Sequence, residues 1–241
     1  MPLATVLREG FAPFVDLLFP PRCPLCGDGI AEQNGLCAPC WLTLEIPGGP
    51  VCDTCQAPLR EGEAQRCAHC TARSPRHDGV YAGTVYTDAA RTLVLRYKHG
   101  RKIAMAPLLA RLMAARLPVM EEEWLLVPVP LHWTRQWQRG FNQSALLAKS
   151  LGRLLGQPVL VDGLKRTKRT KSLGGMGGKA RKSALQGAIA GNPRRANALA
   201  GARVLLVDDV LTSGATSAAC VDALKAAGAT QVRIACFARV L

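Results

Sequence analysis

Residues 204–217 read VLLVDDVLTSGATS, and this stretch decides the fold. Val204–Val207 are four consecutive apolar residues, a pattern typical of a central parallel strand that is covered on both faces. Asp208 and Asp209 follow directly, where we expect the strand to end. In open α/β sheets, ligands bind outside the carboxyl ends of the strands. The sequence therefore predicts a ligand site at this edge of the sheet.

The residues after the acid pair have the composition of a phosphate-binding turn, and they lead into a helix expected over 217–227. They are Thr212, Ser213, Gly214, Ala215 and Thr216. Unpaired backbone N–H groups and the helix dipole favour an anion at such a turn. Carboxylates beside a phosphate cradle suit a sugar phosphate, with the acids binding ribose hydroxyls and the turn binding the 5′-phosphate. The alternative is an ordinary strand–turn–helix with two capping acids.

Strands and helices alternate through the larger part of the chain. We expect strands over 80–86, 125–130, 159–161, 204–207 and 231–240, and helices over 89–97, 103–117, 144–155 and 217–227. Such alternation predicts an α/β fold in which helices flank a parallel sheet.

Eight of the ten cysteines form four CxxC pairs near the start of the chain. They are Cys23, Cys26, Cys37, Cys40, Cys52, Cys55, Cys67 and Cys70. Two CxxC turns complete a tetrahedral zinc site, and a disulfide framework is the alternative. Sequential pairing predicts two structural zinc ions, one on the first four cysteines and one on the last four. The spacing alone also allows crossed pairing.

Charge divides the chain into an acidic module, residues 1–78, and a basic domain, residues 79–241. The module holds 6 Lys and Arg against 9 Asp and Glu, whereas the domain holds 25 against 8. The domain therefore suits polyanions such as pyrophosphate or nucleic acid. Residues 1–20 predict a short amphipathic helix without a signal-peptide cleavage site. No window reaches the roughly 18 apolar residues of a membrane span, so we expect a cytoplasmic protein.

Two basic segments are further candidates for anion contacts. Tyr97, Lys98, His99 and Gly100 end a predicted helix, either as a pyrophosphate contact or as an ordinary glycine-stopped helix end. The second segment, 165–182, contains no acid and surrounds a glycine-rich run. It predicts a flexible basic loop that closes over a polyphosphate or follows a nucleic-acid backbone. Its cations include Lys165, Arg166, Lys168, Arg169 and Lys171.

Residues 204–216 resemble, position by position, the phosphoribosyl pyrophosphate (PRPP) signature of type I phosphoribosyltransferases. With the CxxC module, RYKHG (96–100), PVPL (128–131) and RGFNQS (139–144), nearly the whole chain resembles the ComF family. The resemblance implies a zinc-ribbon module joined to a phosphoribosyltransferase-type domain, which binds PRPP with Mg²⁺. It also implies that 97–100 contacts pyrophosphate. Members are associated with natural transformation, in which incoming single-stranded DNA is handled inside the cell.

Two functions follow as expectations. In the first, the protein is a phosphoribosyltransferase in which Asp208 and Asp209 position the ribose, and its acceptor cannot be named from the sequence. In the second, it is a non-catalytic module with a regulatory or vestigial PRPP pocket. It then holds single-stranded DNA by charge and by stacking on Trp133, Trp137 and Phe141. Either function makes the DNA-uptake machinery a partner.

Overall fold

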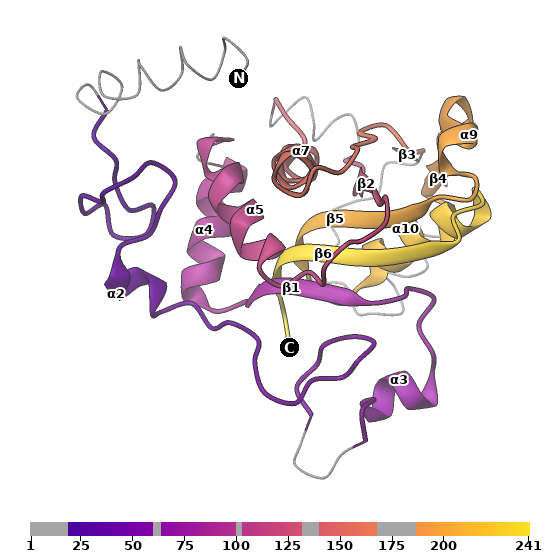
Figure 1. Cartoon of the computed structure of the whole chain (residues 1–241), viewed down its shortest axis with the longest axis horizontal. Coiled ribbons are helices and arrows are strands. Elements are labelled where there is room, and N and C mark those ends of the chain that lie inside the picture. Colours follow the sequence, from indigo (N-terminus) through magenta and orange to yellow (C-terminus); the bar gives the residue numbers. More distant parts are fainter. Residues whose placement is uncertain (1–18, 60–63, 100–102, 132–139, 168–186) are drawn as a thin grey trace.

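A four-stranded parallel sheet forms the centre of the protein (Figure 1). The computed structural model describes residues 19–59, 64–99, 103–131, 140–167 and 187–241. The strand order is β1-β6-β5-β2, and every pairing is parallel. The strands are β1 (Val80–Val85), β2 (Leu125–Pro128), β5 (Arg203–Leu211) and β6 (Gln231–Arg239). The predicted fold class is confirmed.

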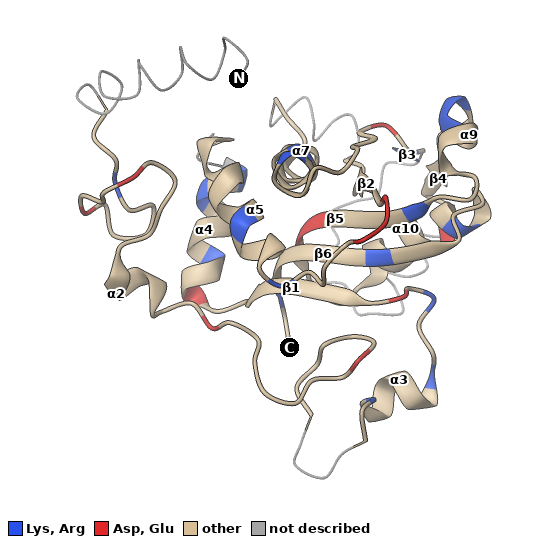
Figure 2. Ribbon diagram, in the orientation of Figure 1, with Lys and Arg blue, Asp and Glu red and all other residues tan. Residues whose placement is uncertain are grey.

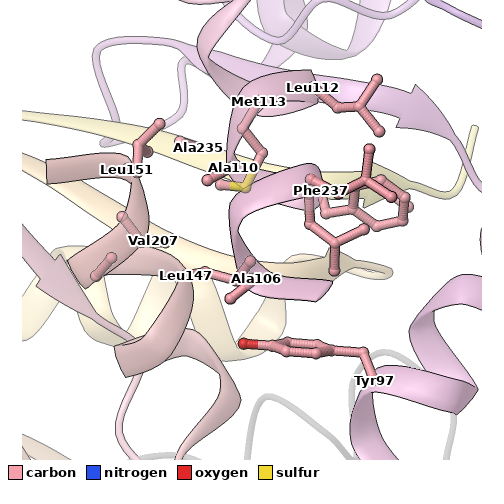
Figure 3. Close-up of a cluster of buried hydrophobic side chains, with 14 of the residues drawn as sticks. Tyr97, Ala106, Ala110, Leu112, Met113, Leu147, Leu151, Val207, Ala235 and Phe237 are labelled. Carbon is pink, nitrogen blue, oxygen red and sulfur yellow. The ribbon is translucent and has the colours of Figure 1, made fainter. Parts of the chain in front are cut away.

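Helices cover both faces of the sheet, which explains the apolar runs in β5 and β6. One face packs against α4 (Asp88–His99), η1 (Ile103–Met105), α5 (Ala106–Ala114) and α7 (Gln143–Leu155). The other packs against α10 (Ala215–Ala226), α9 (Ala196–Leu199) with η2 (Pro193–Arg195), and the antiparallel pair β3 (Leu164–Arg166) and β4 (Ile189–Gly191). Figure 3 shows the first core, where Phe237 of β6 lies among side chains of α5.

The close packing of α5 on β1 requires a glycine at position 83. A Cβ atom there would lie 3.0 Å from the carbonyl oxygen of Phe237 and 3.2 Å from the backbone of Leu112 and Met113. Because these neighbours are backbone atoms, they cannot move aside as a flexible side chain would. The residue therefore sets how near α5 approaches the sheet.

The strand that carries the acid pair is longer than the sequence predicts. We expected it to end at Val207, but β5 continues to Leu211 because β6 stays paired with it as far as Arg239. Pairing between β5 and β2, in contrast, ends where Val207 lies opposite Pro128. Asp208 and Asp209 therefore lie in the last part of the strand, beyond its β2 partner.

Other boundaries differ for local reasons. The helix expected over 103–117 is a short 3-10 turn followed by α5, which has a proline in its first turn and ends at Ala114. The strand expected over 159–161 is only a single bridge between Val159 and Leu126. Lys165 and Arg166 lie in β3, not in a loop, because β4 pairs with them. Lys168, Arg169, Lys171 and the predicted helix over 1–20, up to residue 18, lie outside the described residues.

In the described residues of the cysteine module there are two short helices, α2 (Ala38–Trp41) and α3 (Ala68–Ala72). We call residues 19–44 the first ribbon and 50–72 the second ribbon. The first ribbon lies beside α4 and α5, where Arg96 donates a hydrogen bond to the carbonyl oxygen of Pro24 and Arg111 donates one to that of Asn34. The chain between the ribbons then follows β1, since the carbonyl oxygen of Glu45 accepts from the Val85 N–H at 2.8 Å. Among the described helices, none has the length and apolar character to span a bilayer.

Candidate phosphoribosyl site and metal centres

The two adjacent carboxylates of β5 are held by different helices. One oxygen of Asp208 accepts hydrogen bonds from the Ser144 hydroxyl, at 3.1 Å, and from the Asp209 N–H, at 2.9 Å. The Asp209 carboxylate forms an ion pair with the Lys98 ammonium at 2.9 Å, and its side chain is only 7% exposed. Figure 2 shows this acidic segment at the carboxyl end of β5. The structure thus brings together α4, α7 and β5 around one acid pair.

Burial and the neighbouring carboxylate change the pKa of Asp208. Burial, with the neighbouring charge of Asp209 as the second cause, raises the pKa of Asp208 from 3.8 to about 7. The Asp209 N–H, the Lys98 charge and the Ser144 hydroxyl act in the opposite direction. A carboxyl with a pKa near neutrality changes charge easily when a cation or a ligand hydroxyl arrives.

The start of α7 fixes the position of Ser144. The Asn142 side chain accepts hydrogen bonds from the backbone N–H groups of Ser144 and Ala145, at 3.0 and 3.4 Å, and so caps the helix. Its amide nitrogen also donates to the carbonyl oxygen of Val129 at 3.2 Å, which fastens the helix to the chain after β2. Our sequence reasoning did not include Ser144 in the site. Its place in the RGFNQS motif is the signal that could have found it.

Tyr97, which we expected to contact PRPP, has its side chain in the core. It is completely buried, and its hydroxyl donates to the carbonyl oxygen of Gln143 at 2.8 Å. Its ring also packs against Phe141, with the ring centroids 6.4 Å apart. Figure 3 shows Tyr97 at one end of the cluster, with its oxygen on the side of Leu147. Only the backbone of Tyr97 is left for a ligand, and the neighbouring Lys98 is the residue that reaches the acid pair.

Two expected contacts of the same segment, and two of the aromatic candidates, cannot be placed. His99 is the last residue of α4, but its side chain lies outside the described residues, as does Gly100. Trp133 and Trp137 lie outside them as well.

The predicted phosphate turn stands between β5 and α10. Thr212 and Ser213 are exposed, and Gly214 has a φ of 71°, in the left-handed region that glycine adopts without strain. Ala215 and Thr216 begin α10, two residues earlier than the sequence predicts. The first N–H groups of a helix have no partner within it, so this turn has the backbone geometry of an anion site.

The eight CxxC cysteines form two separate groups of four. Cys23, Cys26, Cys37 and Cys40 make one group, and Cys52, Cys55, Cys67 and Cys70 make the other. Within each group the ligand atoms lie within 4.8 Å of one another. This grouping agrees with sequential pairing and not with crossed pairing.

The sulfur geometry fits tetrahedral zinc. The sulfurs of Cys26 and Cys37 are 3.5 Å apart and those of Cys55 and Cys67 are 3.7 Å apart. Four zinc–sulfur bonds of about 2.3 Å in a tetrahedron place the sulfurs a little under 4 Å apart. In a disulfide the two sulfurs are about 2.05 Å apart. All eight thiols are free. Four thiolates so close repel one another, and a divalent cation removes that repulsion.

The two ribbons share one turn design. In the first, the Gly27 N–H donates to the carbonyl oxygen of Cys23 at 2.9 Å, and in the second Gln56 donates likewise to Cys52 at 2.7 Å. Both residues have positive φ, 89° for Gly27 and 54° for Gln56. Each turn aims two cysteines at one point, as zinc ribbons require.

The fold and the cysteine groups define a double zinc ribbon joined to a phosphoribosyltransferase-type domain. Comparison with family models agrees: a double zinc ribbon domain matches residues 14–72, and a phosphoribosyl transferase domain matches residues 142–241. The chain belongs to the ComF family. It is 32% identical to Competence protein F of Haemophilus influenzae, over 88% of this chain and 94% of that protein.

Further relatives carry names that refer to DNA utilization or to competence. The DNA utilization protein YhgH of Salmonella typhimurium is 29% identical, over 91% of this chain and 90% of that protein. Competence protein ComFC of Bacillus subtilis is 32% identical over 40% of this chain and 36% of that protein. Among solved structures, the allosteric regulatory enzyme of purine biosynthesis matches with a TM-score of 0.38 and 23% identity, over 54% of this chain and 25% of that chain. The family assignment does not depend on that overlap.

Proposed function

We propose that this protein binds PRPP together with Mg²⁺ at the carboxyl edge of its sheet and transfers the phosphoribosyl group to an acceptor in the cytoplasm. The observation that carries the proposal is the acid pair of β5. It is held by Ser144 and Lys98 and followed by the glycine turn that opens α10. Carboxylates, a cation and a phosphate turn are the three groups that a phosphorylated sugar pyrophosphate needs.

Each part of the site has a separate task. The turn 212–216 binds the 5′-phosphate through backbone N–H groups and hydroxyls. Asp208 and Asp209 accept hydrogen bonds from the ribose hydroxyls and so orient the anomeric carbon. The Lys98 ammonium leaves its ion pair with Asp209 and binds the pyrophosphate. There it balances the negative charge that develops as the pyrophosphate leaves. Positioning and charge stabilisation of this kind account for most of the rate in reactions without a covalent intermediate.

The acid pair also fits the metal that accompanies PRPP. Carboxylate oxygens are the protein ligands that Mg²⁺ prefers, usually one or two of them together with phosphate oxygens of the substrate. When bound, Mg²⁺ supplies positive charge to the pyrophosphate. That positive charge also favours the ionised form of Asp208, whose pKa burial raises.

Calorimetric titration with PRPP and Mg²⁺ tests the binding step. We expect Asp208→Asn and Lys98→Gln each to weaken PRPP binding by about tenfold or more, which corresponds to at least about 1.4 kcal/mol. Asp162→Asn is the matched control, because Asp162 pairs with Arg195 and not with a residue of the site. Equal affinity in all four proteins would contradict the proposal. Release of pyrophosphate in the presence of candidate acceptors then tests turnover.

A second function is favoured by the charge of the larger domain. Residues 79–241 carry 25 Lys and Arg against 8 Asp and Glu, so a nucleic-acid strand would meet this part of the protein. Lys165 and Arg166 lie on β3, where Lys165 is exposed and offers a fixed start for such a contact, whereas Arg166 is half-buried near Cys220. Of the aromatic candidates, Phe141 packs against Tyr97, so its ring is only partly available to a base.

Salt dependence separates the two functions. If single-stranded DNA binds by charge, its affinity falls with salt by a slope of roughly −0.7 per phosphate neutralised. Replacement of Lys165, Arg166, Lys168 and Arg169 by Ser then flattens the slope. Competition between Mg²⁺–PRPP and a labelled oligonucleotide would place both ligands on one surface. Independent binding would place the DNA elsewhere.

A further inference from the structure

A groove of about 1070 Å³ separates the second ribbon from α10. Among its lining residues, Val80, Ile234, Val221 and Leu211 are buried and give it an apolar floor. The groove reaches the turn 212–215, but of its described lining residues none belongs to the acid pair or to α4. We call it the ribbon groove. The groove therefore shares the turn 212–215 with the proposed PRPP site and extends from it away from the acid pair.

The ribbon groove is lined by basic side chains although the cysteine module is acidic overall. Arg73, Arg76 and His77 come from the module and the segment that follows it, and Arg239 comes from the end of β6. Arg76 is paired with Asp222 at 2.9 Å, but both side chains are more than half exposed, so the pair is weak. Residues 1–78 hold only 6 Lys and Arg, and two of these line this one groove.

Two buried nitrogen atoms in the groove point to a ligand. One guanidinium nitrogen of Arg239 and the Nδ1 atom of His77 are shielded from solvent, and neither has a hydrogen-bond partner among the described residues. The two groups lie near enough for the Arg239 charge to lower the pKa of His77, after burial as the larger cause. A buried nitrogen without a hydrogen-bond partner destabilises the folded protein. An anion bound between the two side chains would remove that destabilisation.

We propose that the ribbon groove binds a nucleoside monophosphate. The phosphate is held by Arg239 and His77, with Arg73 at the open side, and the base lies on the apolar floor. A guanidinium presents a planar fork that matches phosphate oxygens. The volume is ample for one nucleotide, since small-molecule sites commonly measure about 300–1,000 Å³. The ligand would touch the turn 212–215 from the side of the second ribbon, so the two proposed sites share this turn and differ in their other residues.

Calorimetric titration of the full chain with AMP tests this proposal, with adenosine and inorganic phosphate as separate probes. We expect AMP to bind more tightly than either fragment, because the floor and the cations act on different parts of it. Arg239→Met should weaken AMP binding by about tenfold or more, and Arg73→Gln by a smaller factor. Arg153→Gln, an exposed arginine on α7, is the matched control for Arg73→Gln and should leave AMP affinity unchanged.

The same variants separate this site from the PRPP site. Lys98→Gln should weaken PRPP binding and leave AMP binding intact. Arg239→Met should weaken AMP binding more than it weakens PRPP binding. If AMP binding is lost in Lys98→Gln and kept in Arg239→Met, AMP occupies the PRPP site and the proposal is overturned. Absence of AMP binding at millimolar concentration in the unmodified protein overturns it too. Circular dichroism checks that Arg239→Met is folded. Arg239→Lys, which keeps a positive charge in the groove, should bind AMP more tightly than Arg239→Met.

Discussion

The guanidinium of Arg96 donates a hydrogen bond to the carbonyl oxygen of Pro24. Pro24 lies between Cys23 and Cys26, inside a metal-binding turn, and Arg96 lies two residues before Lys98 on α4. Since Lys98 pairs with Asp209, one hydrogen bond joins the first ribbon to the helix that serves the acid pair. The first ribbon therefore supports the helix that contacts the acid pair, and with it the proposed ligand site.

We predict that Arg96→Met weakens PRPP binding severalfold and lowers the melting temperature. The loss of a hydrogen bond from a charged group costs about 1.5–3 kcal/mol, and the end of α4 loses an anchor. Calorimetry with PRPP and thermal unfolding measure the two effects.

Arg111→Met is the control, because Arg111 donates to the carbonyl oxygen of Asn34 in the same ribbon but belongs to α5. It should lower the melting temperature and leave PRPP affinity close to that of the unmodified protein. Equal losses of affinity in both variants would mean that the first ribbon affects the whole domain and not α4.

The cysteine groups predict close to two zinc ions per chain by elemental analysis. Cys52→Ser should reduce this to about one and destabilise the second ribbon, because structural zinc contributes on the order of 10 kcal/mol to folding. Cys220→Ala is the control, since Cys220 is buried in α10 outside both groups. Protein that contains no zinc and has eight oxidised thiols would refute the metal assignment.

The raised pKa of Asp208 predicts how stability changes with pH. In the unfolded chain this carboxyl ionises near 3.8, and in the folded protein near 7, so the fold favours the protonated form. The contribution of Asp208 to stability is thus present at low pH and is lost as the pH rises from about 4 to about 7. Asp208→Asn keeps the group neutral, so its melting temperature should exceed that of the unmodified protein at pH 8.

The advantage of Asp208→Asn should shrink as the pH falls toward 4, and an advantage that grows at low pH would contradict this assignment.

Replacement of Asp209 should change the melting temperature in the opposite direction. The sequence alone predicts that both acids serve ligand binding and not stability, but Asp209 is buried against Lys98. Asp209→Asn should lower the melting temperature, because it leaves a partly buried ammonium without its partner.

The turns of the two ribbons predict unequal effects on stability when their residues are exchanged. Gly27→Gln should destabilise the first ribbon by about 1 kcal/mol, because a side chain is disfavoured at a φ of 89°. Gln56→Gly should cost less than that or stabilise the second ribbon, since it removes a side chain from a left-handed position. Chelator titration followed by zinc release measures both. Equal destabilisation in the two variants would show that the Gln56 side chain has a role of its own.

The sequence predicted the elements whose pattern is local. The apolar run of β5, the CxxC spacing and the glycine turn at 214 each depend on neighbours within a few residues, and the structure has the expected strand, cysteine groups and turn. The family resemblance added the RGFNQS segment, whose Asn142 caps α7.

Contacts between distant segments could not be predicted. The length of β5 depends on β6, which pairs with it through Leu211 and Arg239. Tyr97 has the sequence position of a ligand contact, but its environment is set by Gln143 and Phe141, more than forty residues away. The ribbon groove likewise needs the end of β6 and the second ribbon to meet, which no spacing reveals.

The last strand of the chain lies inside the sheet, between the first strand and β5. During synthesis, β1 and β5 must therefore wait for β6 before the sheet can close. The ribbons have no such constraint, because all their cysteines precede residue 71. Zinc can thus order the two ribbons of the nascent chain while the domain that follows them is still open, and the order of folding is from metal to sheet.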